Sequence, residues 1–172
     1  MKEWFEKTIL GLNLCPFARI PYERGLVRLV DAEATDPTAA QHAFLNELEH
    51  MNDESAQKLS TTLLGFPAWK IPFEDFLDFA ENMEELIDVV GIYESIQLVV
   101  FHPHFRLDGF PKESFAHWPN SSPYPVLHLL RRPEVLMATT PERSQQISLA
   151  NEAVIEQLSV LDRKKFFPWK CY

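Results

Sequence analysis

Apolar side chains recur three and four residues apart in four stretches of the chain, which is the spacing of an amphipathic helix. These stretches predict helices over 4–13, 37–51, 73–90 and 141–161. The second stretch begins with Asp36-Pro37, a typical helix start, because Asp caps free amide groups and Pro is tolerated at the first helical position. In the last helix, the side chains expected to point inward are Ile147, Ala150, Val154, Leu158 and Leu161.

Three shorter apolar runs predict strands over 26–30, 61–66 and 95–101. The last run is almost continuously apolar, which predicts a strand that is buried on both faces. Residues 126–138 fit either a strand or a short helix. Prolines at positions 16 and 21 disfavour a regular helix over 14–21, because proline lacks an amide hydrogen and restricts the residue before it.

The order of these elements favours an α/β domain, with α+β as the alternative. Strands and helices alternate as β-α-β-α-β, so we expect a sandwich of helices on a sheet of at least three strands, with parallel crossovers. No repeat or boundary interrupts the pattern, and residues 1–172 are expected to form a single domain. The proline-rich stretch 102–125 is expected to be a long loop, and such loops are often functional. The apolar tail 166–169 is expected to pack on the domain or on a partner.

The net charge of −9 is concentrated in the middle of the chain, where residues 31–94 hold fifteen acidic and two basic side chains. Nucleic-acid binding needs clustered Lys and Arg, so we expect no nucleic-acid partner. We also expect no membrane association, because no apolar run could span a bilayer and the start lacks the pattern of a signal peptide. Cys15 and Cys171 are too few for a disulfide scaffold, which together with these features predicts a cytoplasmic protein.

Three segments depart from the helix and strand patterns: Leu12–Ala18 (LNLCPFA), Phe101–Phe105 (FHPHF) and Asn120–Arg131 (NSSPYPVLHLLR). With the run Thr61–Leu64, they resemble the bacterial and plastid proteins grouped as domain of unknown function 1415, over nearly the whole chain. That family typically has an acidic residue where His104 stands here, and an arginine where Ser121 stands. The resemblance implies membership of a family and no particular reaction.

His102, His104, His128 and Cys15 are candidate metal ligands. The first two follow the predicted third strand, and ligands of parallel α/β sheets usually bind beyond the strand ends. Cys15, His102 and His128 would make a three-ligand set with an open position, which suits zinc or iron. The same three side chains are candidate catalytic residues, with Cys15 as nucleophile and His128 as general base. The alternative is an inert packed thiol and histidines that only bond to the backbone.

Arginines gather beside the motif segments, whereas residues 31–94 contain none. Because the guanidinium group binds carboxylate and phosphate through a planar fork, this placement suggests a site for a small anion. The alternative is pairing with the acidic helix faces. The sequence has no glycine-rich phosphate loop, so no nucleotide cofactor is expected. The candidate ligand-binding side chains are Arg19, Arg106, Asn120, Ser122, Tyr124 and Arg131.

Three hypotheses for the function follow from these features. The first is an enzyme-like domain that binds a small anionic metabolite at the Cys/His/Arg site, with or without a metal. The second is a non-catalytic module that binds a protein partner or a second copy of itself through loop 102–125 and the aromatic tail. The third is that the motifs are structural, with Arg131 bonding to loop carbonyls.

Overall fold

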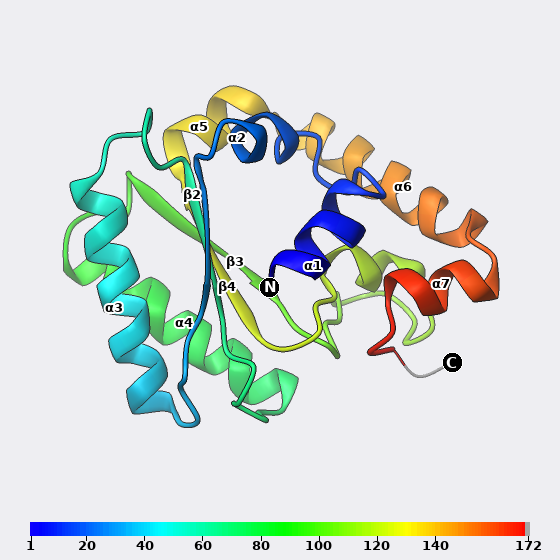
Figure 1. Ribbon diagram of the computed structural model, residues 1–172, viewed down its shortest axis with the longest axis horizontal. Helices are drawn as coiled ribbons and strands as arrows, with labels where there is room; N and C mark the ends of the chain where they lie inside the picture. The colour runs from blue at the N-terminus through cyan, green and yellow to red at the C-terminus, as the bar shows by residue number, and fades with distance from the viewer. Residues whose placement is uncertain (171–172) are drawn as a thin grey trace.

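The computed structural model describes residues 1–170, which form a mixed sheet between two layers of helices (Figure 1). Within these residues, four strands pair in the order β1-β2-β4-β3. β1 is parallel to β2, whereas β4 is antiparallel to both of its neighbours. The predicted α/β class, with helices packed on a sheet, is confirmed. The strands are β1 (Val27–Asp31), β2 (Thr61–Gly65), β3 (Ile96–Phe101) and β4 (Val126–Arg131).

β4 changes the sheet that the sequence predicts. β1, β2 and β3 run in the same direction, as expected, but β4 separates β2 from β3. The ambiguous stretch 126–138 is a strand followed by a helix, since β4 leads directly into α5 (Arg132–Ala138). β3 is therefore at the edge of the sheet, and the prediction that it is buried on both faces is wrong, because within this strand only Ile96 and Leu98 are buried. The strand with every residue buried is β2.

α3 (Pro37–Asp53) and α4 (Phe73–Val89) cover one face of the sheet (Figure 1). The start of α3 is capped as the sequence predicts, because the Asp36 carboxylate accepts a hydrogen bond of 3.0 Å from the Ala39 amide. The buried stripes of both helices meet alternate side chains of the strands in the larger of the two cores. That core includes Phe44, Met51, Leu64, Phe76, Ile87, Ile96, Leu127 and Leu129.

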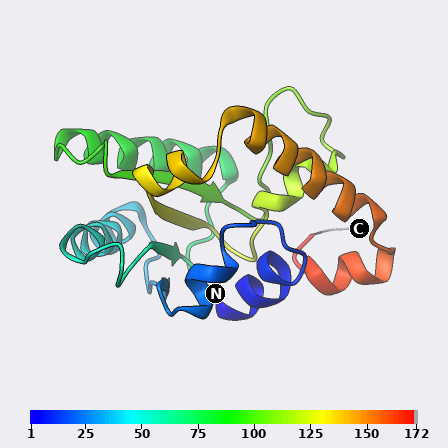
Figure 2. The ribbon, with the colours of Figure 1, turned by 90° about the horizontal axis from the view of Figure 1, so that it is seen from above.

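The opposite face is covered by both ends of the chain (Figure 2). The N-terminal helix begins as α1 (Lys2–Trp4), widens to the π-helix η1 (Phe5–Leu10), and stops at Asn13, whose φ is 53°. α6 (Pro141–Gln157) and α7 (Val160–Phe166) lie on the same side. A smaller core joins these parts to the sheet through Trp4, Phe5, Ile9, Leu63, Val126, Ile155 and Phe167.

Two helix predictions differ from the structure. α2 (Arg19–Glu23) forms despite Pro21, because that proline lies in the first turn, where its missing amide hydrogen is not needed. In α6, Ala150, Val154 and Leu161 of the predicted inner face are exposed or lie beyond the helix, and the buried positions are Asn151 and Ile155. No helix within residues 1–170 is long and apolar enough to cross a membrane.

The long loop and the tail are held by specific contacts. Loop 102–125 contains the short 3-10 helix η2 (Phe115–Asn120), and the buried His117 ties its parts together. The ring of His117 accepts a hydrogen bond from the Leu107 amide at 3.0 Å and donates one to the Pro111 carbonyl at 2.8 Å. The apolar tail packs back on the domain, since Phe167 is fully buried and the Trp169 indole donates to the Ser121 hydroxyl at 2.7 Å.

Candidate functional site

A cavity of about 780 Å³ opens on the face of the sheet away from α3 and α4. Its walls come from the segment after the first helix, from loop 102–125, and from α5 and α6. All three motif segments reach it, and most of the side chains around it are apolar. Its floor is the middle of the sheet, formed by Thr61, Leu63, Val99, Phe101, His128 and Leu130.

His128 lies in this floor because strand register places it opposite Leu63 of β2 and Val99 of β3. Its Nε2 atom lies 2.6 Å from the Thr61 hydroxyl oxygen, and that hydroxyl donates to the Leu129 carbonyl at 2.7 Å. A hydroxyl has a single proton, so the contact between the ring and Thr61 requires a proton on His128 Nε2. Burial lowers the pKa of His128 to about 4, and the ring is therefore neutral at pH 7.

The second ring nitrogen of His128, Nδ1, has no hydrogen bond among the described residues, and the ring lines the cavity. In a neutral ring with a proton on Nε2, the Nδ1 atom carries a lone pair and can only accept a hydrogen bond. Among the described residues, no bond to Nδ1 is found, and the sealed side-chain atoms without a partner are Trp4 Nε1 and Thr62 Oγ1. His128 Nδ1 is not one of those sealed atoms, so it is accessible, and the space beside it is the cavity.

Cys15 also lines the cavity, from the segment that follows the first helix. Burial raises the pKa of its thiol, and the backbone amides of Phe17 and Ala18 counter that effect only in part. The group is therefore a protonated thiol at neutral pH, which is a weak nucleophile.

Several other polar side chains in the walls are hydrogen-bonded within the protein. The Asn151 amide donates to the Leu14 carbonyl at 2.7 Å, and the Asn120 amide donates to the Val100 carbonyl at 3.2 Å. Glu134 accepts from the Ser60 hydroxyl at 2.6 Å. Glu152 accepts a hydrogen bond of 3.1 Å from the Ser114 hydroxyl, which joins α6 to the long loop. These bonds brace the cavity walls, while no hydrogen bond among the described residues engages Nδ1 of His128 in the cavity floor.

Comparison with family models finds a match, described as Protein of unknown function (DUF1415), which covers residues 1–165. The chain belongs to the DUF1415 family. The search of curated proteins and the search of solved structures returned no match. The family that the sequence resembled is thereby confirmed over residues 1–165, and its description assigns no function.

His102 and His104 do not line the cavity of this DUF1415 protein. His102 is buried beside Phe73 and Phe76 at the start of α4, where its Nε2 donates to the Ile71 carbonyl at 3.1 Å and its Nδ1 accepts from the His104 amide at 3.1 Å. Burial is the main cause that lowers the pKa of His102 to about 4. Both ring nitrogens are thus engaged with backbone, and the structure does not bring His102 together with Cys15 and His128.

The metal set expected from the sequence is not assembled in the DUF1415 fold. Within residues 1–170, no group of three or more His, Cys, Asp or Glu side chains has an arrangement that could hold a metal ion. The physical reason is that His102 follows β3 and turns towards α4, whereas His128 projects from the middle of β4 into the cavity.

The arginines expected to hold an anion have other partners. Arg19 donates to the Leu10 carbonyl at 2.8 Å, at the end of the first helix. Arg131 lines the cavity, but its guanidinium group donates to the carbonyls of Leu59, Met51 and Glu54 at 2.9, 2.8 and 2.5 Å. Arg106 is exposed and outside the cavity. These guanidinium groups do not converge on one pocket, and anion binding by them stays a prediction.

Ser122 and Tyr124 shape the turn before β4 instead of lining the cavity. The Ser122 hydroxyl donates to the Tyr124 carbonyl at 2.6 Å, and the Tyr124 hydroxyl donates to Asp31 at 2.6 Å. Burial and the Asp31 carboxylate raise the pKa of Tyr124. Gly65 permits this packing, because a Cβ atom there would lie 2.6 Å from Tyr124 Cε2. In the structure, Ser122 and Tyr124 connect the turn before β4 to the end of β1.

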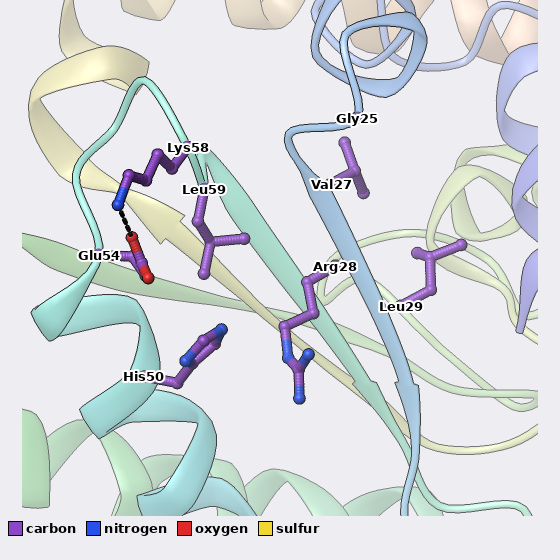
Figure 3. Close-up of a pocket in the computed structure, with 8 residues that line it drawn as sticks. All are labelled: Gly25, Val27, Arg28, Leu29, His50, Glu54, Lys58 and Leu59. Atoms are coloured by element: carbon purple, nitrogen blue, oxygen red, sulfur yellow. Dashed lines mark ion pairs between the residues drawn. The ribbon is translucent and has the colours of Figure 1, made fainter.

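A second, shallower depression of about 450 Å³ lies beside β1 and the end of α3 (Figure 3). Charged side chains in and near it already pair with each other. Arg28 donates twice to Glu47, at 2.6 and 3.0 Å, and Lys58 lies 3.3 Å from Glu54 (the dashed contact in Figure 3). Because these charges are neutralised within the protein, the larger cavity is the stronger candidate site.

Two residues that contribute to the cavity, Thr61 and Asn151, were not predicted from the sequence as site residues. Thr61 acts on His128 only because β2 pairs with β4, and no local pattern reveals that pairing. Asn151 has a signal that could have been used, since it interrupts the apolar stripe of α6 between Ile147 and Ile155. A polar side chain in a buried stripe is expected to have a specific hydrogen-bond partner, as Asn151 does.

The reactivity of Cys15 can be measured directly. In a Cys171→Ser background, alkylation by iodoacetamide at pH 7.5 is expected to be at least about tenfold slower than that of free cysteine, because the buried thiol is protonated. The same protein in urea should react at the rate of an ordinary thiol. Alkylation of the folded protein faster than free cysteine would instead support the nucleophilic role predicted from the sequence.

Proposed function

We propose that this DUF1415 protein binds a small, predominantly apolar molecule in the cavity above the sheet. The observation that carries the proposal is the cavity itself, with about 780 Å³ of space, a mainly apolar lining and an accessible histidine nitrogen in its floor. Small-molecule sites commonly have a volume of about 300–1,000 Å³ and an apolar lining with a few polar groups. The cavity fits that description.

The lining favours an apolar ligand over the small anion that the sequence suggested. The charged residues that line the cavity are Arg131, Glu134 and Glu152, and each is already hydrogen-bonded within the protein. A bound anion would therefore lose hydration without gaining a free cationic partner, which is unfavourable in an apolar site. An apolar body lying on Leu63, Val99 and Leu130 would gain from leaving water.

The protonation states of His128 and Cys15 favour binding over catalysis. A histidine with a pKa near 4 is a weak base at neutral pH, and a thiol with a raised pKa is a weak nucleophile. The module hypothesis receives less support, because the aromatic tail that was expected to dock a partner is packed on the domain.

Titration with indole, followed by amide chemical shifts in ¹H–¹⁵N spectra, tests the proposal. Indole is a compact apolar molecule that the cavity can hold, and we expect saturable shifts at residues of the cavity floor. Val99→Phe should weaken binding, because the added ring occupies the space above β3. Val154→Phe is the matched control on the outer side of α6, where the side chain is 38% exposed, and it should leave binding unchanged. Absence of shifts up to millimolar indole, or equal binding by the Val99→Phe protein, would refute the proposal.

A further inference from the structure

We propose that Thr61 holds His128 as a hydrogen-bond acceptor and thereby makes the cavity selective for ligands that carry a hydroxyl or N–H donor. This inference rests on the proposed function, because it concerns what the same cavity selects. Thr61 is a positioning residue in this scheme, and His128 is the group that contacts the ligand.

The first step is the direction of the hydrogen bonds. Thr61 lies in β2 and is almost fully buried, between the ring of His128 and the backbone of β4. A backbone carbonyl can only accept, so the single Thr61 hydroxyl proton goes to Leu129 O at 2.7 Å. The hydroxyl oxygen then accepts at 2.6 Å from His128, which places the imidazole proton on Nε2.

The second step is the state of the other ring nitrogen. Because the proton is held on Nε2, Nδ1 carries the lone pair of a ring that lines the cavity. The neighbouring floor is apolar, formed by Leu63, Val99 and Phe101, and offers that lone pair no donor. Burial keeps the ring neutral at pH 7, so this acceptor is not converted into a donor.

The third step is the consequence for ligands. A molecule with one hydroxyl or N–H group can donate to Nδ1 while its apolar body covers the floor. A molecule of the same shape without a donor would leave His128 Nδ1 buried and unpaired. In a molecule with only an acceptor, that acceptor would lie against the Nδ1 lone pair. The cavity is therefore expected to prefer, among apolar ligands of similar shape, those that carry one hydrogen-bond donor.

The tautomer of His128 can be measured without any ligand. Long-range ¹H–¹⁵N spectra at pH 7.5 distinguish a protonated from an unprotonated ring nitrogen, and we expect the Nε2–H form in the wild-type protein. Thr61→Val keeps the shape of the side chain and removes the hydroxyl, so we expect a mixture of the two tautomers. Thr61→Ser restores the hydroxyl and should restore the single form, which separates the positioning role from a loss of packing.

The ligand preference is tested with indole and benzothiophene, which are similar in size and differ in the N–H donor. The wild-type protein is expected to bind indole about threefold to tenfold more tightly, which is the range for one net hydrogen bond. Thr61→Val should lower this ratio, because only part of the His128 population then presents an acceptor, and Thr61→Ser should recover it.

The possible outcomes distinguish a failure of this inference from a failure of the proposed binding function. Equal binding of indole and benzothiophene by the wild-type protein would overturn the selectivity while the binding function stands. A wild-type His128 with its proton on Nδ1, or an unchanged tautomer in Thr61→Val, would overturn the role of Thr61. If neither probe binds, the proposed function and the selectivity both fall, and the tautomer spectra still decide whether Thr61 positions the ring.

Discussion

Replacing Arg131 with methionine is expected to lower the free energy of unfolding by about 3 kcal/mol, as measured by urea denaturation at pH 7.5. The guanidinium group donates to three carbonyls, those of Met51, Glu54 and Leu59. Two of these lie at the end of α3 and the third lies just before β2, so one side chain joins a helix end to the sheet. Methionine keeps much of the aliphatic volume but leaves these acceptors without a charged donor.

Arg132→Met is the matched control for Arg131→Met. Its guanidinium group donates to one carbonyl, that of Tyr93, at 2.8 Å, and stacks over the Tyr93 ring at an exposed position. We expect a loss of less than about 1 kcal/mol for this variant. Equal losses for the two variants would contradict the structural role assigned to Arg131. The third hypothesis drawn from the sequence also gives Arg131 a structural role, but the carbonyls that it bonds to lie at the end of α3 and before β2 and not in loop 102–125.

Stability is expected to fall steeply as the pH decreases from about 6.5 to 4, because His102 and His128 resist protonation in the folded state. Burial lowers the pKa of both side chains to about 4, whereas an unfolded histidine has a pKa of about 6.5. Between these values the unfolded chain binds protons that the folded chain does not. Each histidine then removes up to about 1.4 kcal/mol of unfolding free energy per pH unit. Above pH 6.5 both states are neutral at these positions, and this contribution to the slope disappears.

Urea denaturation at several pH values tests the pH dependence, with the slope compared between variants. The double variant His102→Gln and His128→Gln should show a shallower slope than the wild type, whatever the substitutions cost at neutral pH. Carboxylates contribute to acid unfolding in both proteins and cancel in the comparison. His42→Gln, which removes an exposed histidine from α3, is the control. A wild-type slope no steeper than that of the double variant would contradict the assignment of these two groups.

Most of the helices and strands could be predicted because their causes are local. The apolar stripe of α4, the Asp36 cap of α3 and the β2 run depend on residues close in sequence. β4 could not be predicted with the same certainty, since the stretch 126–138 has no clear period until its partners are known. Its position between β2 and β3 depends on pairing across more than sixty residues on the β2 side, where Leu63 faces His128.

The candidate site was predicted in part. Cys15 and His128 were selected from the sequence as chemistry-bearing residues, and both line the same cavity. His102 was selected for the same reason, but its two ring nitrogens bind backbone groups beside α4. Residue type does not distinguish His102 from His128. Their properties in the fold are also similar, because burial lowers the pKa of both and both are held by hydrogen bonds. The difference is one of position, since His102 follows β3 and packs against α4, whereas His128 lies in the middle of β4 and lines the cavity.

By itself, the sequence determined the α/β class, the family and the segments that surround the cavity, because composition, periodicity and motifs are properties of short stretches. The tertiary structure alone decided that β4 lies inside the sheet, that Arg131 donates to backbone carbonyls, and that Thr61 faces His128. These features depend on contacts between residues far apart in the chain. A hydrogen bond at 2.6 Å exists only when strand register brings both partners to the same place, and register is a property of the whole sheet.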